Sequence, residues 1–139
     1  MERTTELNAA IVSATAQSFP ADTPVYMVNL LRYKDHADYN NAAGAAPCSG
    51  REVYFQRYAG WFKKIAADKG VKVLFLGSVS AGIAVPEGEQ WDDIVIVEYP
   101  SYATFRQIVE SEEYLADAAP HRKATLEDWR LIATNRIEL

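Results

Sequence analysis

The chain has 139 residues, 49% of them hydrophobic and 24% charged, which is the composition of one globular domain with an ordinary hydrophobic core. Its formal net charge of −5 argues against a nucleic-acid partner, because proteins of that class usually present a basic face. The absence of any run of about twenty apolar residues argues against a membrane span. The one cysteine, Cys48, cannot form an internal disulfide, and together these features predict a cytoplasmic protein.

Residues 4–19 are predicted to form a helix that ends before Pro20. Its narrow apolar stripe follows helical spacing and consists of Leu7, Ala10, Ile11 and Ala14. Because the stripe is mostly alanine, we expect this helix to pack against the rest of the domain without nucleating its folding. Residues 1–23 are therefore interpreted as a helical extension of a single domain that spans residues 1–139.

Four strands and two further helices are predicted after this extension. The strands are expected at residues 24–33, 71–85, 93–99 and 129–137, the second of them continuous or broken near Gly77 or Gly82. One helix is expected at residues 49–68, begun by a capping box of Ser49 and Glu52, and another at residues 102–110, followed by a turn that Ser111 caps. The order predicts an α+β class, ferredoxin-like βαββαβ antiparallel sheet.

The strands at residues 24–33 and 93–99 are apolar on both faces. In the ferredoxin-like order these strands form the central pair, and the helices cover only one face of the sheet. A strand of this kind is normally covered on both sides. We therefore expect a homodimer in which a second copy packs sheet to sheet against the open face.

Residues 34–49 are predicted to be an inserted polar loop, rich in small and turn-forming residues. Asp35, His36 and Asp38 lie close together in it, but their spacing matches no metal-binding motif. The sequence therefore predicts a solvated loop and no metal site.

Three short patterns in the last third of the chain carry a family resemblance. A strand ends in Glu98-Tyr99-Pro100-Ser101, a Ser-x-x-Tyr pattern follows at Ser111 and Tyr114, and Arg122 comes shortly before the last strand. With these patterns the segment 97–132 resembles the C-terminal half of the DUF1330 family of bacterial proteins. The resemblance implies a dimeric α+β barrel, in agreement with the predicted order of elements, but no particular chemistry.

The predicted topology brings several polar and aromatic residues to one rim of the sheet. The expected site residues are Asn29, Arg32, Tyr54, Tyr58, Trp61, His121 and Arg122. His121 titrates near neutrality and is a candidate acid or base, while Arg122 offers a fork of donors to a carboxylate. Arg32 also has a structural interpretation, as the cross-strand partner of Asp92 or Asp93.

Two classes of function remain open at this point. One is a cofactor-independent enzyme for a small organic, acidic metabolite, with His121 and Arg122 as catalytic residues and the others binding the ligand. The superfamily resemblance adds monooxygenases and haem-handling proteins as less favoured versions, but no haem motif is present. The other class is a non-catalytic dimer in which Arg122 holds the carboxylate of its ligand. No cofactor is predicted.

Overall fold

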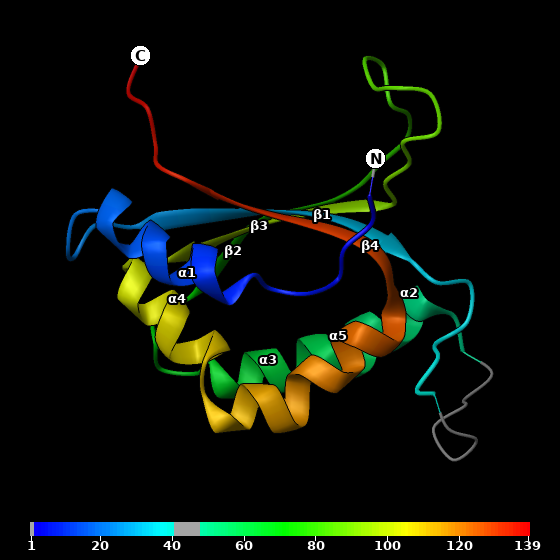
Figure 1. Cartoon of the computed structure of the whole chain (residues 1–139), viewed down its shortest axis with the longest axis horizontal. Helices are drawn as coiled ribbons and strands as arrows, with labels where there is room; N and C mark the ends of the chain where they lie inside the picture. Colours follow the sequence, from blue (N-terminus) through cyan, green and yellow to red (C-terminus); the bar gives the residue numbers. More distant parts are fainter. Residues whose placement is uncertain (1, 41–47) are drawn as a thin grey trace.

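The computed structural model describes residues 2–40 and 48–139, and it shows a four-stranded antiparallel sheet with the helices on one face (Figure 1). The strands are β1 (Val25–Tyr33), β2 (Lys72–Ser78), β3 (Asp93–Tyr99) and β4 (Leu126–Thr134). Their order across the sheet is β2-β3-β1-β4, so β1 and β3 are the central pair. The predicted ferredoxin-like order is confirmed. The part of the predicted loop at residues 41–47 lies outside the described residues.

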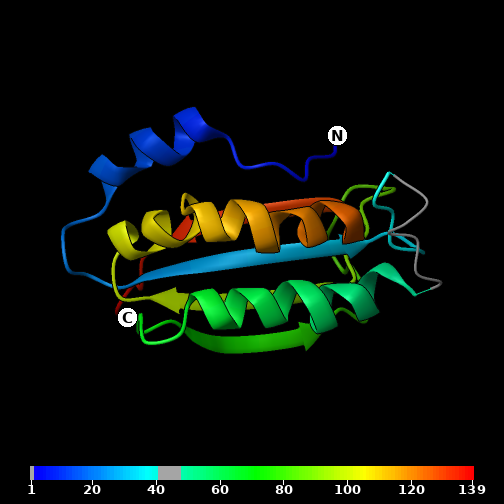
Figure 2. The same ribbon diagram turned by 90° about the horizontal axis from the view of Figure 1, so that it is seen from below.

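The helices form a layer below the sheet. Their bounds are α1 (Ala9–Thr15), α2 (Gly50–Val53), α3 (Ala59–Ile65), α4 (Tyr102–Val109) and α5 (Ala119–Thr125). A π turn, Tyr54–Tyr58, joins α2 to α3, and a second one, Tyr114–Ala118, precedes α5. The α2–α3 and α4–α5 segments run side by side along the sheet, and α1 lies outside them (Figure 2). In the described ranges no helix is long and apolar enough to cross a bilayer.

Serine caps begin three helical segments, and two of these caps, Ser49 and Ser111, are predicted from the sequence. Ser49 and Glu52 form the capping box, in which the Glu52 amide donates to Ser49 Oγ at 3.1 Å. Ser101 accepts from the Thr104 amide, and Ser111 accepts from the Tyr114 amide, both at 3.1 Å. These local hydrogen bonds fix the entry of each helix into the layer.

The N-terminal helix differs from its prediction in both extent and buried face. It begins at Ala9, because the Asn8 side chain accepts from the Ile11 amide at 3.1 Å and caps it there. Val12 is its buried residue, whereas Ile11, from the predicted stripe, is 61% exposed. The preceding residues lie along β4 and form neither helix nor strand.

Two strands also differ from their predicted bounds. β2 ends at Ser78, directly after Gly77, and the following residues leave the sheet and return to it at β3. The last strand begins at Leu126, where α5 ends, and stops at Thr134. Consequently, the segment 79–92 and the C-terminal tail rise from the sheet on the side away from the helices (Figure 1).

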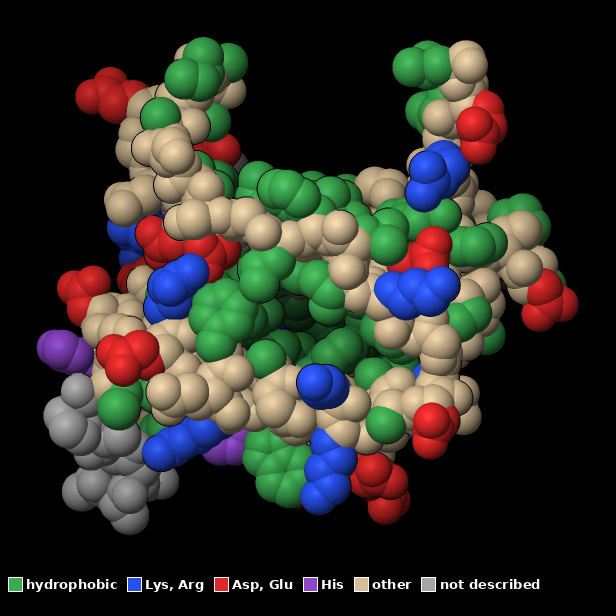
Figure 3. Space-filling model, turned by 180° about the vertical axis from the view of Figure 1, so that it is seen from behind, with side chains coloured by type: hydrophobic (Ala, Val, Ile, Leu, Met, Phe, Trp, Pro, Cys, Tyr) green, Lys and Arg blue, Asp and Glu red, His purple; other side chains and the backbone are tan. Residues whose placement is uncertain are grey.

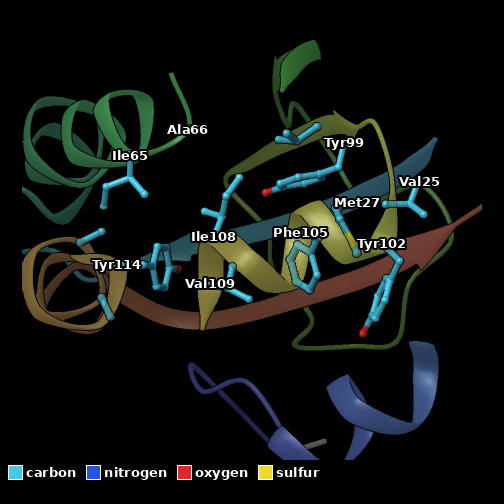
Figure 4. Close-up of a cluster of buried hydrophobic side chains, with 13 residues drawn as sticks. Val25, Met27, Ile65, Ala66, Tyr99, Tyr102, Phe105, Ile108, Val109 and Tyr114 are labelled. Atoms are coloured by element: carbon cyan, nitrogen blue, oxygen red, sulfur yellow. The ribbon is translucent and has the colours of Figure 1, made fainter. Parts of the chain in front are cut away.

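The core lies between the sheet and the helix layer, and α4 contributes much of it (Figure 4). Phe105 and Ile108 of α4 are 3% and 0% exposed and pack in one cluster with Val25 and Met27 of β1. Tyr99 at the end of β3 meets the Phe105 ring edge to face, with 5.2 Å between the ring centroids. This cluster holds the sheet and the helices at a fixed separation, and the candidate site lies in the space between them.

Candidate functional site

A cavity of about 60 Å³ lies between the sheet and the helices. Its lining is aromatic and apolar apart from one amide: Leu7, Asn29, Tyr54, Tyr58, Phe62, Val95, Val97, Tyr99, Phe105, Val109, Tyr114, Trp129 and Leu131. Viewed from behind, the molecule is hollowed below the sheet, and hydrophobic side chains line the hollow (Figure 3). No carboxylate belongs to the lining in the described part of the chain.

The two π turns supply three of the four tyrosines of this cavity, and Tyr99 of β3 is the fourth. In each turn one amide bonds five residues back, from Ala59 to the Tyr54 carbonyl and from Ala119 to the Tyr114 carbonyl. In the second turn Pro120 follows directly and has no N–H to continue the α-helical pattern. A π turn shifts the phase of a helix and often occurs at functional sites. Here the shift occurs where three tyrosines face one another.

A chain of hydrogen bonds connects Arg122 of α5 to these tyrosines. Arg122 Nη1 donates to the Tyr114 hydroxyl at 2.6 Å. The Tyr114 and Tyr58 hydroxyls are 2.8 Å apart, and either can be the donor. Because the Tyr114 oxygen already accepts from Arg122, its own proton is available to Tyr58 or to a ligand oxygen.

Arg122 is a buried cation with incomplete pairing. It is 3% exposed, and its Nε has no hydrogen-bond partner among the described residues. Its guanidinium carbon lies 4.8 Å from the Trp129 ring centroid and 5.7 Å from that of Tyr114, so aromatic faces compensate part of the charge. The carboxylate closest to it is that of Glu6, whose Oε2 lies 4.0 Å from Nη2, beyond hydrogen-bond distance.

Asn29 is held at the sheet side of the cavity. Its Oδ1 accepts from Trp129 Nε1 at 3.0 Å, and its Nδ2 donates to the Val95 carbonyl at 3.2 Å. Both ends of the amide are therefore used. Asn29 positions the Trp129 ring, which in turn lies against the Arg122 guanidinium.

Burial raises the pKa of Tyr54 and Tyr58 well above the ordinary tyrosine value, and the neighbouring Tyr114 adds to the effect. Burial also raises the pKa of Tyr99. These phenols are therefore neutral at physiological pH and act as hydrogen-bond donors, not as bases. The cavity thus combines an apolar body with a polar end formed by tyrosine hydroxyls, and Arg122 contacts that end from behind through Tyr114.

His121 lies apart from this cavity, although it is adjacent to Arg122 in sequence. Its Nδ1 is 2.7 Å from the Tyr39 hydroxyl, which also accepts from Arg57 Nη1 at 3.1 Å. Burial, and then Arg57, lower the pKa of His121. Successive residues of a helix point about 100° apart. The predicted His121–Arg122 pair is therefore divided between two surfaces of α5.

Arg32 and Trp61 also lie away from the cavity lining. Arg32 follows the strand alternation and lies on the face of β1 opposite to Asn29. Trp61 is half-buried on α3, with the Lys64 ammonium 5.0 Å from its ring centroid. Of the predicted site residues, Asn29, Tyr54, Tyr58 and Arg122 come together, and Arg32, Trp61 and His121 do not.

The predicted ion pair of Arg32 with Asp92 or Asp93 is replaced by other contacts. Arg51 Nε donates to Asp93 Oδ2 at 3.0 Å, and the Tyr33 hydroxyl donates to the same oxygen at 2.8 Å. Asp92 Oδ2 accepts from the Tyr33 amide at 2.8 Å. Both carboxylates do reach the end of β1, where their hydrogen-bond partners among the described residues are Tyr33 and Arg51 and not Arg32.

Sequence reasoning did not include Tyr114, Trp129 and Leu7 among the site residues. Tyr114 belonged to the Ser-x-x-Tyr pattern, and that pattern was the available signal for it. Trp129 starts a predicted strand, and its register position opposite Leu31 comes from the β1–β4 pairing. No sequence pattern indicates that Leu7 lines a cavity, because the predicted helix includes it in a weak alanine stripe.

Comparisons with solved structures agree with this fold. RPA0582, a protein of unknown function from Rhodopseudomonas palustris, matches at a TM-score of 0.85 and 26% identity, over 99% of this chain and 100% of that chain. Its methylated form matches with a TM-score of 0.86 and 27% identity, over 99% of this chain and 98% of that chain. The N-terminal extension therefore has a counterpart in that structure. A dabb family protein with a ferredoxin-like fold from Mesorhizobium loti matches with a TM-score of 0.51 and 10% identity. The match covers 83% of this chain and 98% of that chain, and it indicates the fold alone.

No curated protein matches the chain. The family model described as a domain of unknown function, DUF1330, matches residues 50–135. This range includes both π turns, Arg122 and Trp129, and it extends the resemblance seen in the last third of the sequence back to the start of α2. The chain belongs to the DUF1330 family.

Proposed function

We propose that this protein binds a small organic acid in the cavity between its sheet and helices. The apolar body of the ligand lies among the tyrosines, Phe62 and Trp129, and its acidic group is held by Arg122 and the Tyr114 hydroxyl. The observation that carries this proposal is the buried Arg122 guanidinium, for which residues 2–40 and 48–139 offer neither a partner for Nε nor a carboxylate within hydrogen-bond distance. A buried charge is costly unless it is paired, and a ligand carboxylate supplies that pair.

Binding without catalysis is the version that the geometry supports better. Burial raises the pKa of Tyr54 and Tyr58, so these two phenols stay protonated and cannot remove a proton at neutral pH. The described lining contains neither a carboxylate nor a histidine. A general base must lie within reach of the proton that it takes. His121, the predicted acid or base, contacts Tyr39 outside the cavity.

The test compares an acid with its neutral isostere. Hydrocinnamate and its primary amide have the same shape but differ in charge, and Trp129 provides a fluorescence signal close to the proposed carboxylate position. We expect the acid to bind roughly tenfold more tightly, since a hydrogen bond to a charged group contributes more than a neutral one. Equal dissociation constants for the two probes, or no binding of either, would contradict the proposal.

We further propose that the protein is a homodimer joined through the open face of the sheet. Apolar side chains line this face, including Val28 and Leu30 of β1 and Ile96 of β3. Phe75 of β2 and Ile132 of β4 extend the face and are 52% and 48% exposed. An apolar surface of this extent normally marks an interface, and strands that are apolar on both faces are normally covered on both sides.

Light scattering at micromolar concentration is expected to give the mass of a dimer. Replacing Ile96→Lys places a charge in the centre of the open face, and we expect a folded monomer. Ile11→Lys is the matched control, because Ile11 is 61% exposed on α1, away from the sheet face, and should leave the dimer intact. A monomeric wild-type chain, or an Ile96→Lys dimer, would argue against this interface.

A further inference from the structure

Residues 2–8, here called the N-terminal strap, cross β4 without forming a helix or strand (Figure 1). Three polar contacts hold the strap to the start of β4. Arg3 pairs with Glu127, the Thr4 amide donates to Asp128 Oδ1 at 3.0 Å, and Arg130 Nη2 donates to the Glu2 carbonyl at 2.8 Å. Most of these groups are exposed to solvent, where such contacts are weak.

The other end of the strap is firmly anchored by α1. The buried Tyr102 hydroxyl donates to the Val12 carbonyl at 2.6 Å. The ring of Phe19, beyond α1, stacks on the Tyr102 ring with 5.3 Å between their centroids. The strap can therefore leave β4 while α1 stays in place.

Leu7 lies between the inner cavity and two hollows at the protein surface. It lines the inner cavity, and it also lines two outer hollows, of about 320 Å³ beside α5 and about 550 Å³ beside β4. Its side chain packs against both buried hydrophobic clusters of the core. Removing this one side chain would join spaces that are separate when the strap is in place.

Glu6 places a carboxylate beside the basic end of the site. Its Oε1 lies 3.4 Å from Lys123 Nζ, and its Oε2 lies 4.0 Å from Arg122 Nη2. Arg122 lines the hollow beside α5 and not the inner cavity, whereas Tyr114 lines both. Tyr114 therefore connects the two spaces, and the Arg122 guanidinium faces the hollow that Glu6 and Leu7 of the strap line.

The volumes point to the same requirement. The inner cavity of about 60 Å³ holds a few water molecules, whereas small-molecule sites have volumes of about 300 to 1,000 Å³. The adjoining hollow of about 320 Å³, now closed off by Leu7, brings the site into that range.

We propose that Glu6 and Leu7 occupy the site as an internal substitute for its ligand, an acid with a branched or aromatic apolar body. The ligand displaces the strap: its apolar body takes the place of Leu7, and its carboxylate takes the place of Glu6 beside Arg122 and Lys123. This inference rests on the proposed function, because it assumes that the cavity binds an organic acid.

The test measures hydrocinnamate and its amide against strap variants of the full chain. Glu6→Gln removes the competing carboxylate, and we expect the dissociation constant of the acid to fall by about fivefold, because an occupied site lowers apparent affinity. The dissociation constant of the amide should change little. Glu2→Gln removes the same charge from the same strap, away from Arg122, and should leave both constants unchanged. Leu7→Ala should tighten the binding of both probes, since it opens space that they share.

Hydrogen exchange supplies an independent measurement. On addition of hydrocinnamate to the wild-type chain, the Thr4 amide should lose protection while the α1 amides keep theirs. Acid-selective binding that is unaffected by Glu6→Gln, with a protected Thr4 amide, would overturn the strap proposal and leave the proposed function standing. Failure of the acid to bind to any variant would overturn both.

Discussion

The substitution Arg122→Met is expected to abolish the preference of this protein for an acid over its amide. The guanidinium is the buried cation closest to the tyrosine hydroxyls, and methionine has a similar length without charge or donors. A charge-assisted contact to a buried carboxylate contributes about 1.5 to 3 kcal/mol, so the acid should bind roughly 10 to 100-fold more weakly. The amide constant should change much less. Calorimetric titration of both probes measures the ratio of their dissociation constants.

The thermal stability of this variant separates a binding role from a structural one. Exchanging a poorly paired buried ion for an apolar residue is often neutral or stabilising, so the Tm of Arg122→Met should not fall. Arg106→Met is the control for loss of one positive charge, since Arg106 pairs with Glu110 on the surface of α4. Arg122→Lys keeps the charge but loses the planar fork, and we expect it to restore only part of the acid preference. A large drop in Tm with an unchanged ratio would make Arg122 a structural residue.

The substitution Gly50→Ala is expected to cause a large loss of stability. A Cβ at this position would lie 2.5 Å from the Lys34 carbonyl oxygen and 2.6 Å from the Thr125 carbonyl oxygen. Both obstacles are backbone atoms, and they are held by hydrogen bonds from Gly50 N to Lys34 O and from Lys34 N to Thr125 O. Neither can move without separating the ends of β1 and α5 from the start of α2.

We expect Gly50→Ala to reduce the free energy of unfolding by about 3 kcal/mol, as in other overpacked sites. Chemical denaturation measures this change, and a Tm lowered by roughly 10 °C should accompany it. Gly60→Ala is the matched control. Gly60 lies inside α3 with open space around its Cβ position, so alanine there should stabilise the protein by about 0.5 to 1 kcal/mol. Equal effects of the two substitutions would contradict the steric argument.

The sequence by itself determined the order of the strands and the bounds of the two central ones to within one residue, whereas the bounds of α1, β2 and β4 differ and α5 was not among the predicted elements. The alternation along β1 and β3 is a local pattern, and the caps at Ser49 and Ser111 are hydrogen bonds within a few residues. Together with the ferredoxin-like order they identify the sheet and the two central strands. They also predict that Asn29, Tyr54, Tyr58 and Arg122 approach one another.

Tertiary structure alone decided which neighbours of these residues share the cavity. Adjacent residues of any helix point apart, but which of His121 and Arg122 faces the tyrosines depends on the rotation of α5 about its axis, and the π turn at Tyr114–Ala118 shifts that rotation. The start of α1 at Ala9 follows from the local Asn8 cap, but the path of residues 2–8 depends on contacts with Glu127 and Asp128, more than a hundred positions away. Local periodicity carries no information on such distant contacts or on a shift in helical phase, and for this reason the placement of Leu7, Tyr114 and Trp129 around the cavity required the folded chain.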